Sequence, residues 1–219
     1  FNLVVNPLPT ITPPTPLEVC DDGNGDGFTL IDLSVKNSEI TGDSSNYIVS
    51  YHYNLTDAET GANPVPEPYS NTTQNDQLFV SIMDASTGCR STTTLNVTVL
   101  DSPAIDNDSH TIDACEQDDD GFENFDLTTV IDDVLNGITN VSTTFHVTYE
   151  DAQTGNNPIT DITNYTNTTP EFQVIYIRVV DNVTGCPAIA NIELHTNLLL
   201  NESNIRNFSR CDDASNDGI

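Results

Sequence analysis

The amino-acid sequence predicts an all-β fold: tandem immunoglobulin-like β-sandwich repeats of about 95 residues, each with one short helix. Three observations support this prediction. The chain of 219 residues repeats itself at a fixed period, its apolar residues alternate with polar ones over short runs, and Asn, Asp, Gly and Pro separate these runs. Asp is also abundant, which favours turns over helices.

The internal repeat rests on several landmarks. Cys20, Cys115 and Cys211 are spaced by 95 and 96 residues, and the two Thr-Gly-Cys motifs end 97 residues apart, at Cys89 and Cys186. The other matching segments are "DGFTLIDL" (26–33) with "DGFENFDL" (120–127), "DAETGANP" (57–64) with "DAQTGNNP" (151–158), and "LFVSIMD" (78–84) with "IYIRVVD" (175–181). Several motifs that return at one period indicate that one structural unit is repeated.

This period divides the chain into five parts. Residues 17–100 and 112–197 are expected to form the two β-sandwich repeats, with a linker at 101–111. Residues 1–16 match the tail and linker of a preceding repeat, and residues 198–219 match a linker and the start of a following one. We therefore expect the chain to be a segment of a longer array, with extended and semi-rigid linkers between its repeats.

Within each repeat, the alternating runs are rich in Val, Ile, Thr and aromatic residues, which are typical of β-strands. The predicted strands are 47–53, 78–83 and 94–99 in the first repeat, and 145–149, 174–180 and 191–195 in the second. One helix is predicted at 126–137, where Val130, Ile131, Val134 and Leu135 share a face and Gly137 suits a helix end.

The charge of the chain excludes some classes of partner. Five basic residues against 34 acidic ones give a net charge of −29. Nucleic acids and anionic lipids are bound through Lys and Arg clusters, so neither is an expected partner, and the natural partners of such a surface are cations. No apolar stretch reaches the roughly 20 residues of a membrane helix, so we expect no membrane insertion of this segment.

The acidic loops that follow each first cysteine resemble the first half of an EF-hand calcium loop. They place oxygen-bearing side chains at positions 1, 3 and 5 and glycine at position 6. Position 12 carries leucine instead of the usual glutamate, so the remaining ligands are expected to come from the preceding aspartate or from elsewhere in the fold. The predicted calcium ligands are Asp22, Asn24, Asp26, Phe28 (through its carbonyl) and Asp32; Glu116, Asp118, Asp120, Phe122 and Asp126; and Asp213, Ser215 and Asp217. The alternative is a solvated acidic turn that holds no ion.

The cysteines predict structural disulfides, because no C-x-x-C motif and no zinc-ligand spacing is present. Our preferred pairing closes each repeat on itself, as Cys20–Cys89 and Cys115–Cys186, so that each repeat can fold alone. The alternative, Cys89–Cys115 and Cys186–Cys211, joins neighbouring repeats. Either pairing implies an oxidising, extracytoplasmic compartment.

Nothing in the sequence predicts an enzyme. The four histidines (52, 110, 146 and 195) occupy non-equivalent positions with no repeated nucleophile beside them. Tyr51, Tyr53, Tyr69 and Tyr165 could together form a sugar-stacking surface, but the segment has no Trp, and core or hairpin packing is the preferred interpretation of these tyrosines.

The segments "CDDGNGDGFTLIDL … DAETGANP … YSNTT … TGC" and their second copy, "CEQDDDGFENFDL … DAQTGNNP … NYTNTT … TGC", resemble repeats of giant cell-surface adhesins of Bacteroidota, including gliding-motility adhesins exported by the type IX system. The resemblance covers nearly all of the chain. It implies tandem β-sandwich domains that form a stalk or filament outside the outer membrane.

Together these observations predict a non-enzymatic spacer of an extracellular bacterial adhesin or filament, disulfide-bonded and stiffened by calcium, whose partners are the neighbouring repeats. The alternative is a module that binds surface glycans or other proteins. Surface aromatics that differ between the repeats would favour this alternative. A third reading, as accessory repeats of a secreted protease or glycosidase, would need a catalytic domain elsewhere.

Overall fold

The computed structural model describes residues 3–23, 25–116 and 120–198. The first repeat contains β1 (Leu17–Cys20), β2 (Leu30–Ile31), the 3₁₀ helix η1 (Leu33–Lys36), α1 (Asn37–Thr41), β3 (Tyr47–His52), α2 (Leu55–Thr60), β4 (Tyr69–Ser70), β5 (Asn75–Asp84) and β6 (Arg90–Leu100). The second contains β7 (His110–Glu116), β8 (Asn124–Phe125), η2 (Leu127–Val130), α3 (Ile131–Leu135), β9 (Val141–His146), α4 (Tyr149–Thr154), β10 (Tyr165–Thr166), β11 (Phe172–Asp181) and β12 (Pro187–Leu198).

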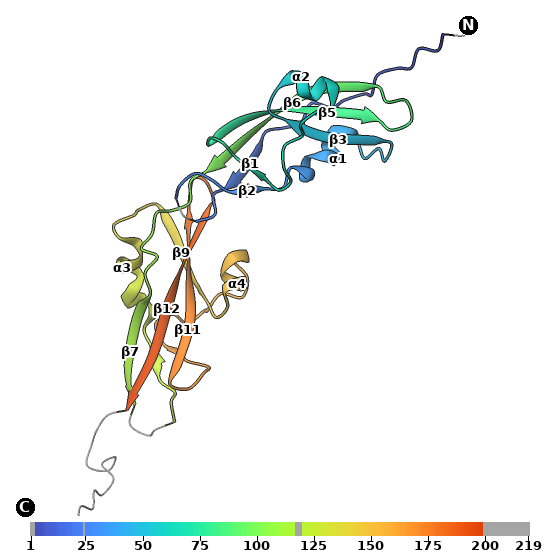
Figure 1. Ribbon diagram of the computed structural model, residues 1–219. Coiled ribbons are helices and arrows are strands. Elements are labelled where there is room, and N and C mark those ends of the chain that lie inside the picture. The colour runs from blue at the N-terminus through green and yellow to red at the C-terminus, as the bar shows by residue number, and fades with distance from the viewer. Residues whose placement is uncertain (1–2, 24, 117–119, 199–219) are drawn as a thin grey trace, which may run out of the picture. The chain divides into compact units, whose positions relative to one another are not determined.

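Both repeats have the same sheet topology. A four-stranded sheet has the order β1-β6-β5-β3 in the first repeat and β7-β12-β11-β9 in the second (Figure 1). A two-stranded sheet, β2-β4 or β8-β10, completes each repeat. The chain is therefore all-β with few short helices, in two tandem immunoglobulin-like repeats, as the sequence predicts.

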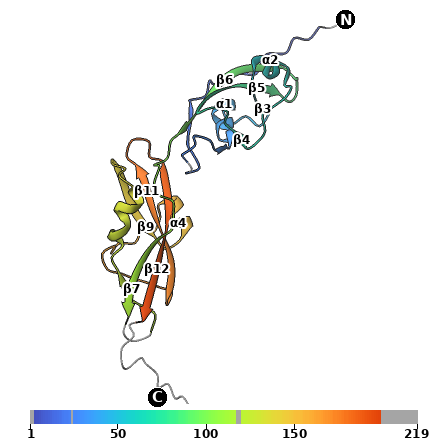
Figure 2. The ribbon, with the colours of Figure 1, turned by 60° about the vertical axis from the view of Figure 1, so that its left-hand side comes forward.

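The first strand of each repeat pairs in parallel with the last one, a feature that the sequence analysis missed. Leu17–Cys20 runs beside Val97–Leu100, and His110–Glu116 runs beside Ile192–Leu198. Figure 2 shows β7 and β12 side by side along the second repeat. This pairing decides where the cysteines lie.

The core comes from the alternation along β5, β6, β11 and β12. Leu95, Val97 and Val99 are buried on β6, while the residues between them are more exposed. A strand with one face on the core gives this period of two. The buried residues of the first repeat form one cluster, made of Ile31, Leu33, Ile40, Tyr51, Val65, Tyr69, Leu78, Val80, Ile82, Leu95, Val97 and Val99.

The described residues of each repeat form two short α-helices and one 3₁₀ helix, where the sequence analysis predicts one helix. The predicted helix at 126–137 corresponds to η2 and α3. The prediction missed one helix in each repeat, α2 in the first and α4 in the second. In α2 the Asn54 side chain accepts a hydrogen bond from the Asp57 backbone, and Gly61 ends the helix at φ +73°. These capping residues define both ends of a helix that is too short to show a periodic apolar face.

The predicted strands agree with the observed ones except at 145–149. There β9 ends at His146, and Tyr149 already begins α4. The Thr148 side chain caps α4 by accepting a hydrogen bond from the Asp151 backbone, so the chain leaves the sheet at Val147.

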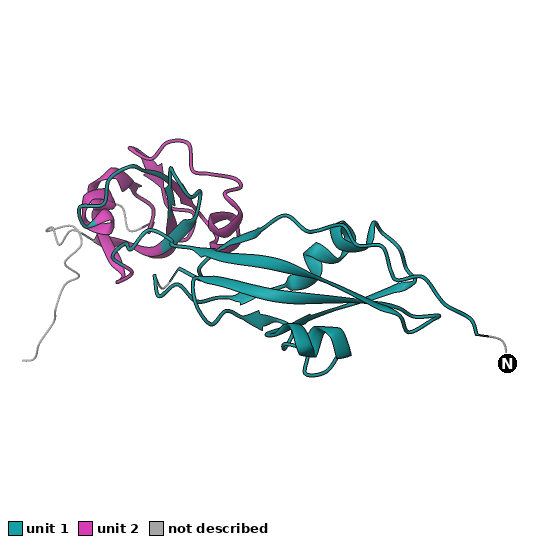
Figure 3. Ribbon diagram, turned by 90° about the horizontal axis from the view of Figure 1, so that it is seen from above, with its two compact units in different colours: residues 1–106, 136–143, 178–189 teal, residues 107–135, 144–177, 190–219 magenta. Residues whose placement is uncertain are grey.

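Residues divide into two compact units that do not coincide with the two repeats (Figure 3). The first unit contains residues 1–106, 136–143 and 178–189, and the second contains 107–135, 144–177 and 190–219. The turn between β11 and β12, at 182–186, therefore belongs to the first unit, although the repeat period assigns it to the second repeat.

Candidate functional site

A single disulfide is formed among the described cysteines. It joins Cys20, the last residue of β1, to Cys186, immediately before β12. The S–S distance is 2.05 Å, and the two residues are 166 positions apart in the sequence. Cys89 and Cys115 are free thiols. The disulfide thus connects a cysteine of the first repeat to a cysteine of the second.

This bond contradicts both pairings that the sequence analysis weighed. The intra-repeat pairing fails because of the parallel strands. Cys20 lies beside Leu100, at the end of β6, whereas Cys89 immediately precedes the start of β6. Eleven strand residues at about 3.3 Å each separate the two by roughly 35 Å, and a disulfide needs Cα atoms within about 7 Å.

The alternative pairing fails as well. It assigns Cys186 to Cys211, but Cys186 is bonded to Cys20. It also assigns Cys89 to Cys115, and both are free. Cys211 lies outside the described residues.

The two Thr-Gly-Cys cysteines are held by the same turn in both repeats. Asp181 Oδ1 accepts hydrogen bonds from the backbone of Val183 and Thr184, at 2.7 and 2.9 Å, and Thr184 Oγ1 accepts one from Cys186. The first repeat repeats this pattern from Asp84 to Cys89. Hydrogen bonds from the backbones of Thr184 and Val183 also hold the pKa of Asp181 below its ordinary value. Cys89 is therefore positioned in its repeat as Cys186 is.

The cysteines of the first strands are equivalent too. Cys20 pairs with Leu100 on β6, and Cys115 pairs with Asn197 on β12. These two partners are 97 residues apart, the same spacing that separates Cys89 from Cys186. Each repeat thus carries two cysteine positions of the same kind, one at each end of its last strand.

The acidic loops are organised by turns and caps. Asp26 Oδ1 accepts a hydrogen bond from the Phe28 backbone at 2.9 Å, and Asp120 does the same for Phe122. Asp32 caps η1 through the Ser34 backbone, and Asp126 caps η2 through the Thr128 backbone. One oxygen of each of these carboxylates therefore has a local structural role.

The repeated Asp-Gly pair has a structural reason that the sequence analysis missed. The buried Asn71 side chain donates to the Gly27 carbonyl at 2.8 Å and accepts from the Thr29 backbone at 2.9 Å. Asn167 makes the equivalent bonds to Gly121 and Glu123. Gly121 has φ +79°, and a Cβ there would lie 2.7 Å from Pro170. The repeated "NTT" segment was the sequence signal for these asparagine hydrogen bonds.

The described residues include only some of the predicted calcium ligands. No group of three or more His, Cys, Asp and Glu side chains among them could hold a metal ion. The predicted ligands Asn24, Asp118, Asp213, Ser215 and Asp217 lie outside the described residues. Two other oxygens, Asp21 Oδ2 and Ser102 Oγ, are buried and have no hydrogen-bond partner. Both residues are 6% exposed, and they follow the paired ends of β1 and β6.

The histidines correct one statement of the sequence analysis. His52 and His146 are equivalent, and both are fully buried. His52 Nδ1 donates to the Ala62 carbonyl at 2.7 Å, which leaves Nε2 to accept from the Ser50 hydroxyl at 2.9 Å. His146 makes the same contacts with Asn156 and Thr144. A buried histidine that is oriented by a backbone carbonyl stabilises the chain after β3 or β9, and a substrate cannot reach it.

Two of the four tyrosines predicted to pack in the core or in hairpins are buried. Tyr51 and Tyr69 are 4% and 0% exposed, and Tyr51 donates to the Leu33 carbonyl. Burial raises the pKa of the Tyr51 phenol above its ordinary value. Tyr53 is 52% exposed, and Tyr165 is half-buried.

Among the helices of the described ranges, none is long and apolar enough to cross a membrane. The disulfide indicates that the chain folds in an oxidising compartment.

Comparison with solved structures gives only distant similarity. The human mucin-like protocadherin EC1-2 is 12% identical, with 87% of this chain and 98% of that chain covered and a TM-score of 0.27. A SusE-like, surface-located polysaccharide-binding protein of Bacteroides thetaiotaomicron is 10% identical, with 69% and 29% covered and a TM-score of 0.38. Drosophila N-cadherin EC1-3 is 12% identical, with 86% and 67% covered and a TM-score of 0.29. No curated protein sequence matches the chain.

A family model matches the chain twice, over residues 16–103 and 111–200. Its description, the Flavobacterium inter-domain disulphide bond domain, agrees with a bond that connects the first matched segment to the second at Cys20 and Cys186. Tandem domains of this kind, joined by a disulfide, are characteristic of a non-enzymatic extracellular repeat. The chain belongs to the Flavobacterium inter-domain disulphide bond domain family.

Proposed function

We propose that this chain is a spacer segment of an extracellular cell-surface adhesin or filament, in which disulfides join each repeat to the next. The observation that carries the proposal is the Cys20–Cys186 bond. It adds a second covalent connection between consecutive repeats to the one that the peptide linker already provides. Two connections restrict the bending and twisting of a junction more than one does, which suits a stalk.

The two free cysteines would continue this connection along the array. We call the resulting series of disulfides between successive repeats the disulfide ladder. Cys89 has the position of Cys186, so its partner is the first-strand cysteine of another repeat. Cys115 has the position of Cys20, so its partner is the Thr-Gly-Cys cysteine of another repeat. Because the two positions lie at opposite ends of the last strand, roughly 35 Å apart, every repeat is bonded to one neighbour at each end.

The adhesin role rests on the sequence resemblance to gliding-motility adhesins and on this architecture. A surface protein exported by the type IX system meets the oxidising conditions that the ladder needs. The structural role of the two buried histidines supports a function without catalysis.

Calcium is the cation that we propose for the acidic loops, as a second stiffening element. The loop carboxylates would share it with Asp21 Oδ2 and Ser102 Oγ, which are hard oxygen ligands without another partner. Bound calcium would lower the repulsion within a chain of net charge −29 and tie the first repeat's loop to the end of β6.

Thiol labelling of the whole protein on the cells that produce it tests this proposal. A membrane-impermeant maleimide should label neither Cys89 nor Cys115 before reduction, and it should label both after reduction. Labelling of these two cysteines without reduction would contradict the ladder. If the reduced cysteines were labelled in lysed cells but not in intact cells, the surface location would be contradicted.

Calorimetric unfolding of the 219-residue chain tests calcium separately. A calcium-specific rise in the midpoint, which magnesium at equal ionic strength does not reproduce and which Asp21→Asn reduces, is the expected result. Equal effects of the two ions would show that the loops are acidic turns only. At 100 times its Kd, an ion that binds only the folded state adds about 2.7 kcal/mol to the free energy of unfolding.

A further inference from the structure

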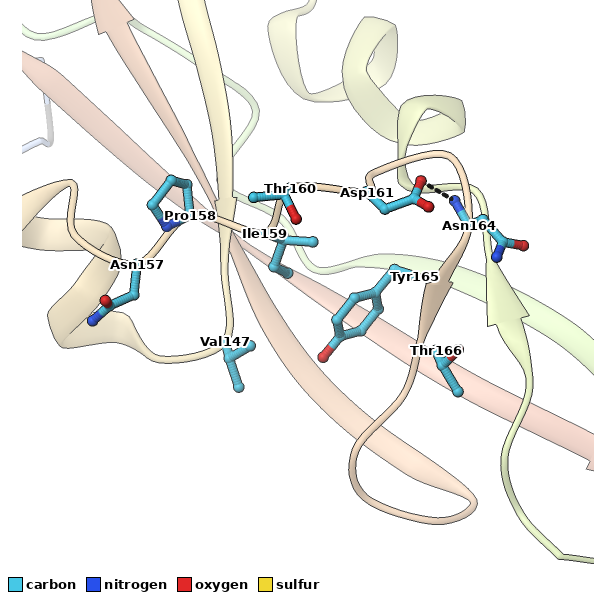
Figure 4. Close-up of a pocket in the computed structure, with 9 residues that line it drawn as sticks. All are labelled: Val147, Asn157, Pro158, Ile159, Thr160, Asp161, Asn164, Tyr165 and Thr166. Carbon is cyan, nitrogen blue, oxygen red and sulfur yellow. Dashed lines mark hydrogen bonds between the residues drawn. The ribbon is translucent and has the colours of Figure 1, made fainter.

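The second repeat has a surface pocket of about 390 Å³, within the ~300–1,000 Å³ range typical of ligand pockets. Figure 4 shows the Tyr165 ring in the middle of the lining residues, with Ile159 above it and Val147 beside its hydroxyl end. Asn157, Pro158, Thr160, Asp161, Asn164 and Thr166 complete the lining. The pocket therefore combines one aromatic ring and three apolar side chains with a polar rim.

The equivalent place in the first repeat is filled by a tyrosine. Tyr53 stands where the second repeat has Val147, since each directly follows the equivalent buried histidine. The Tyr53 ring lies 6.2 Å from the ring of Tyr69, centroid to centroid, and Tyr69 is fully buried. Val147, itself 40% exposed, is too small to cover Tyr165 in this way. The substitution uncovers an aromatic ring in one repeat and not in the other.

The segment before Tyr165 is also longer than its counterpart. Five residues separate Ile159 from Tyr165, whereas three separate Val65 from Tyr69. Asp161 organises the longer segment: its Oδ1 accepts from the Asn164 backbone at 3.2 Å and from the Thr163 hydroxyl at 3.1 Å. The inserted residues thus form an ordered rim with a carboxylate and amides.

A third difference concerns the tyrosine hydroxyl. In the first repeat, the Tyr69 hydroxyl donates to the Asp76 carboxylate. In the second repeat, Gln173 replaces that aspartate, and its Nε2 donates to the Tyr165 oxygen at 3.0 Å. No group in the described parts of the chain accepts a hydrogen bond from the Tyr165 hydroxyl, so its proton can be donated to a ligand.

We propose that this pocket binds one ring of a neutral saccharide. The apolar face of a pyranose ring stacks on an aromatic ring, while its hydroxyl groups need hydrogen-bond acceptors and donors at the edge. Tyr165 supplies the ring and a donor, and Asp161 supplies an acceptor at the rim. An anionic sugar does not fit, because the carboxylate of Asp161 and the net charge of −29 repel anions. This site is independent of the proposed ladder, which uses none of these residues.

The test is an NMR titration of the 219-residue chain, following backbone amides in ¹H–¹⁵N spectra. The probes are the methyl glycosides of glucose, galactose and mannose. An open pocket of this size gives weak binding, with an expected Kd on the order of 1 mM, so titration to about 50 mM saturates it. We expect at least one glycoside to shift the amides of Val147, Ile159 and Tyr165, with Ser70 in the first repeat unchanged.

Two matched variants decide whether the pocket is responsible. Val147→Tyr places the first repeat's own residue over Tyr165 and should abolish the shifts, whereas Tyr53→Val should leave them unchanged. Both positions are exposed, so both variants should fold. No shifts with any of the three glycosides, or shifts that survive Val147→Tyr, would overturn the proposal. Cyclohexanol shifting the same amides as strongly as the glycosides would also overturn it, because the pocket would then be merely apolar.

Discussion

Replacing Cys20 with serine should destabilise the chain more than replacing either free cysteine. A disulfide removes conformational entropy from the unfolded chain, and this loss grows with the logarithm of the number of residues in the loop that the disulfide closes. The Cys20–Cys186 loop spans 166 residues, which corresponds to a loss of about 5 kcal/mol in the simple chain-entropy model. Cys20 is partly exposed, so lost packing adds little to this value.

The measurement is urea unfolding without reductant, followed by far-ultraviolet circular dichroism, with Cys89→Ser and Cys115→Ser as controls. Both control residues are free thiols, and Cys115 is exposed, so we expect changes within about 0.5 kcal/mol for it. Reductant should lower the stability of the wild-type chain to that of Cys20→Ser and should leave Cys20→Ser itself unchanged.

The two possible disulfide pairings are distinguished by which cysteine variant loses stability, and not by the size of the loss. An intra-repeat loop of about 70 residues would give a loss of about 4 kcal/mol, which is close to the value for the longer loop. If Cys89→Ser destabilised the chain as much as Cys20→Ser, Cys20 would be bonded to Cys89 and the reasoning from parallel strands would be refuted.

Three further predictions concern the repeats themselves. Asn167→Ala should lower the free energy of unfolding by about 1–3 kcal/mol in urea titrations, because it removes the hydrogen bonds that the buried Asn167 amide makes with the Gly121 carbonyl and the Glu123 backbone, and an unchanged midpoint would contradict this role of Asn167. Thr148→Ala should cost about 0.5–2 kcal/mol in the same assay by removing the cap of α4, whereas Thr148→Ser should be nearly neutral. Burial acts to raise the pKa of Asp76, but hydrogen bonds from Tyr69 and two neighbouring threonines outweigh it and hold the pKa below the ordinary 3.8. The stabilisation from Asp76 is therefore present above pH 3.8 and is lost as the pH falls through the lowered pKa. Asp76→Asn should consequently reduce the loss of stability that the chain shows between pH 4 and pH 2. An unchanged dependence of stability on pH would show that this carboxylate does not contribute.

Much of the fold is readable from the sequence because long strands carry a regular signal. The predicted strand 78–83 lies within β5, and 94–99 lies within β6, since both bury one face and alternate along their length. Short elements carry no such signal. The helix α2 is defined by its caps, Asn54 and Gly61, rather than by an apolar stripe.

The candidate site was harder to predict than the fold. The cysteine spacing marks the repeat, but the pairing depends on the direction of β1 relative to β6, and four residues of β1 do not reveal whether a strand runs parallel. The equivalence of His52 and His146 was readable from the period and was missed. The pocket at Tyr165 depends on a difference between the copies at Val147, which only a structural comparison of the repeats makes visible.

Peptide mapping of the non-reduced chain by mass spectrometry tests the central claim most directly. Proteolysis between the cysteines, with thiols blocked at acidic pH to prevent exchange, leaves each disulfide as one linked pair of peptides. We predict a pair that contains Cys20 and Cys186, together with alkylated peptides for Cys89 and Cys115. A linked pair of Cys20 with Cys89, or of Cys115 with Cys186, would instead show that each repeat closes on itself.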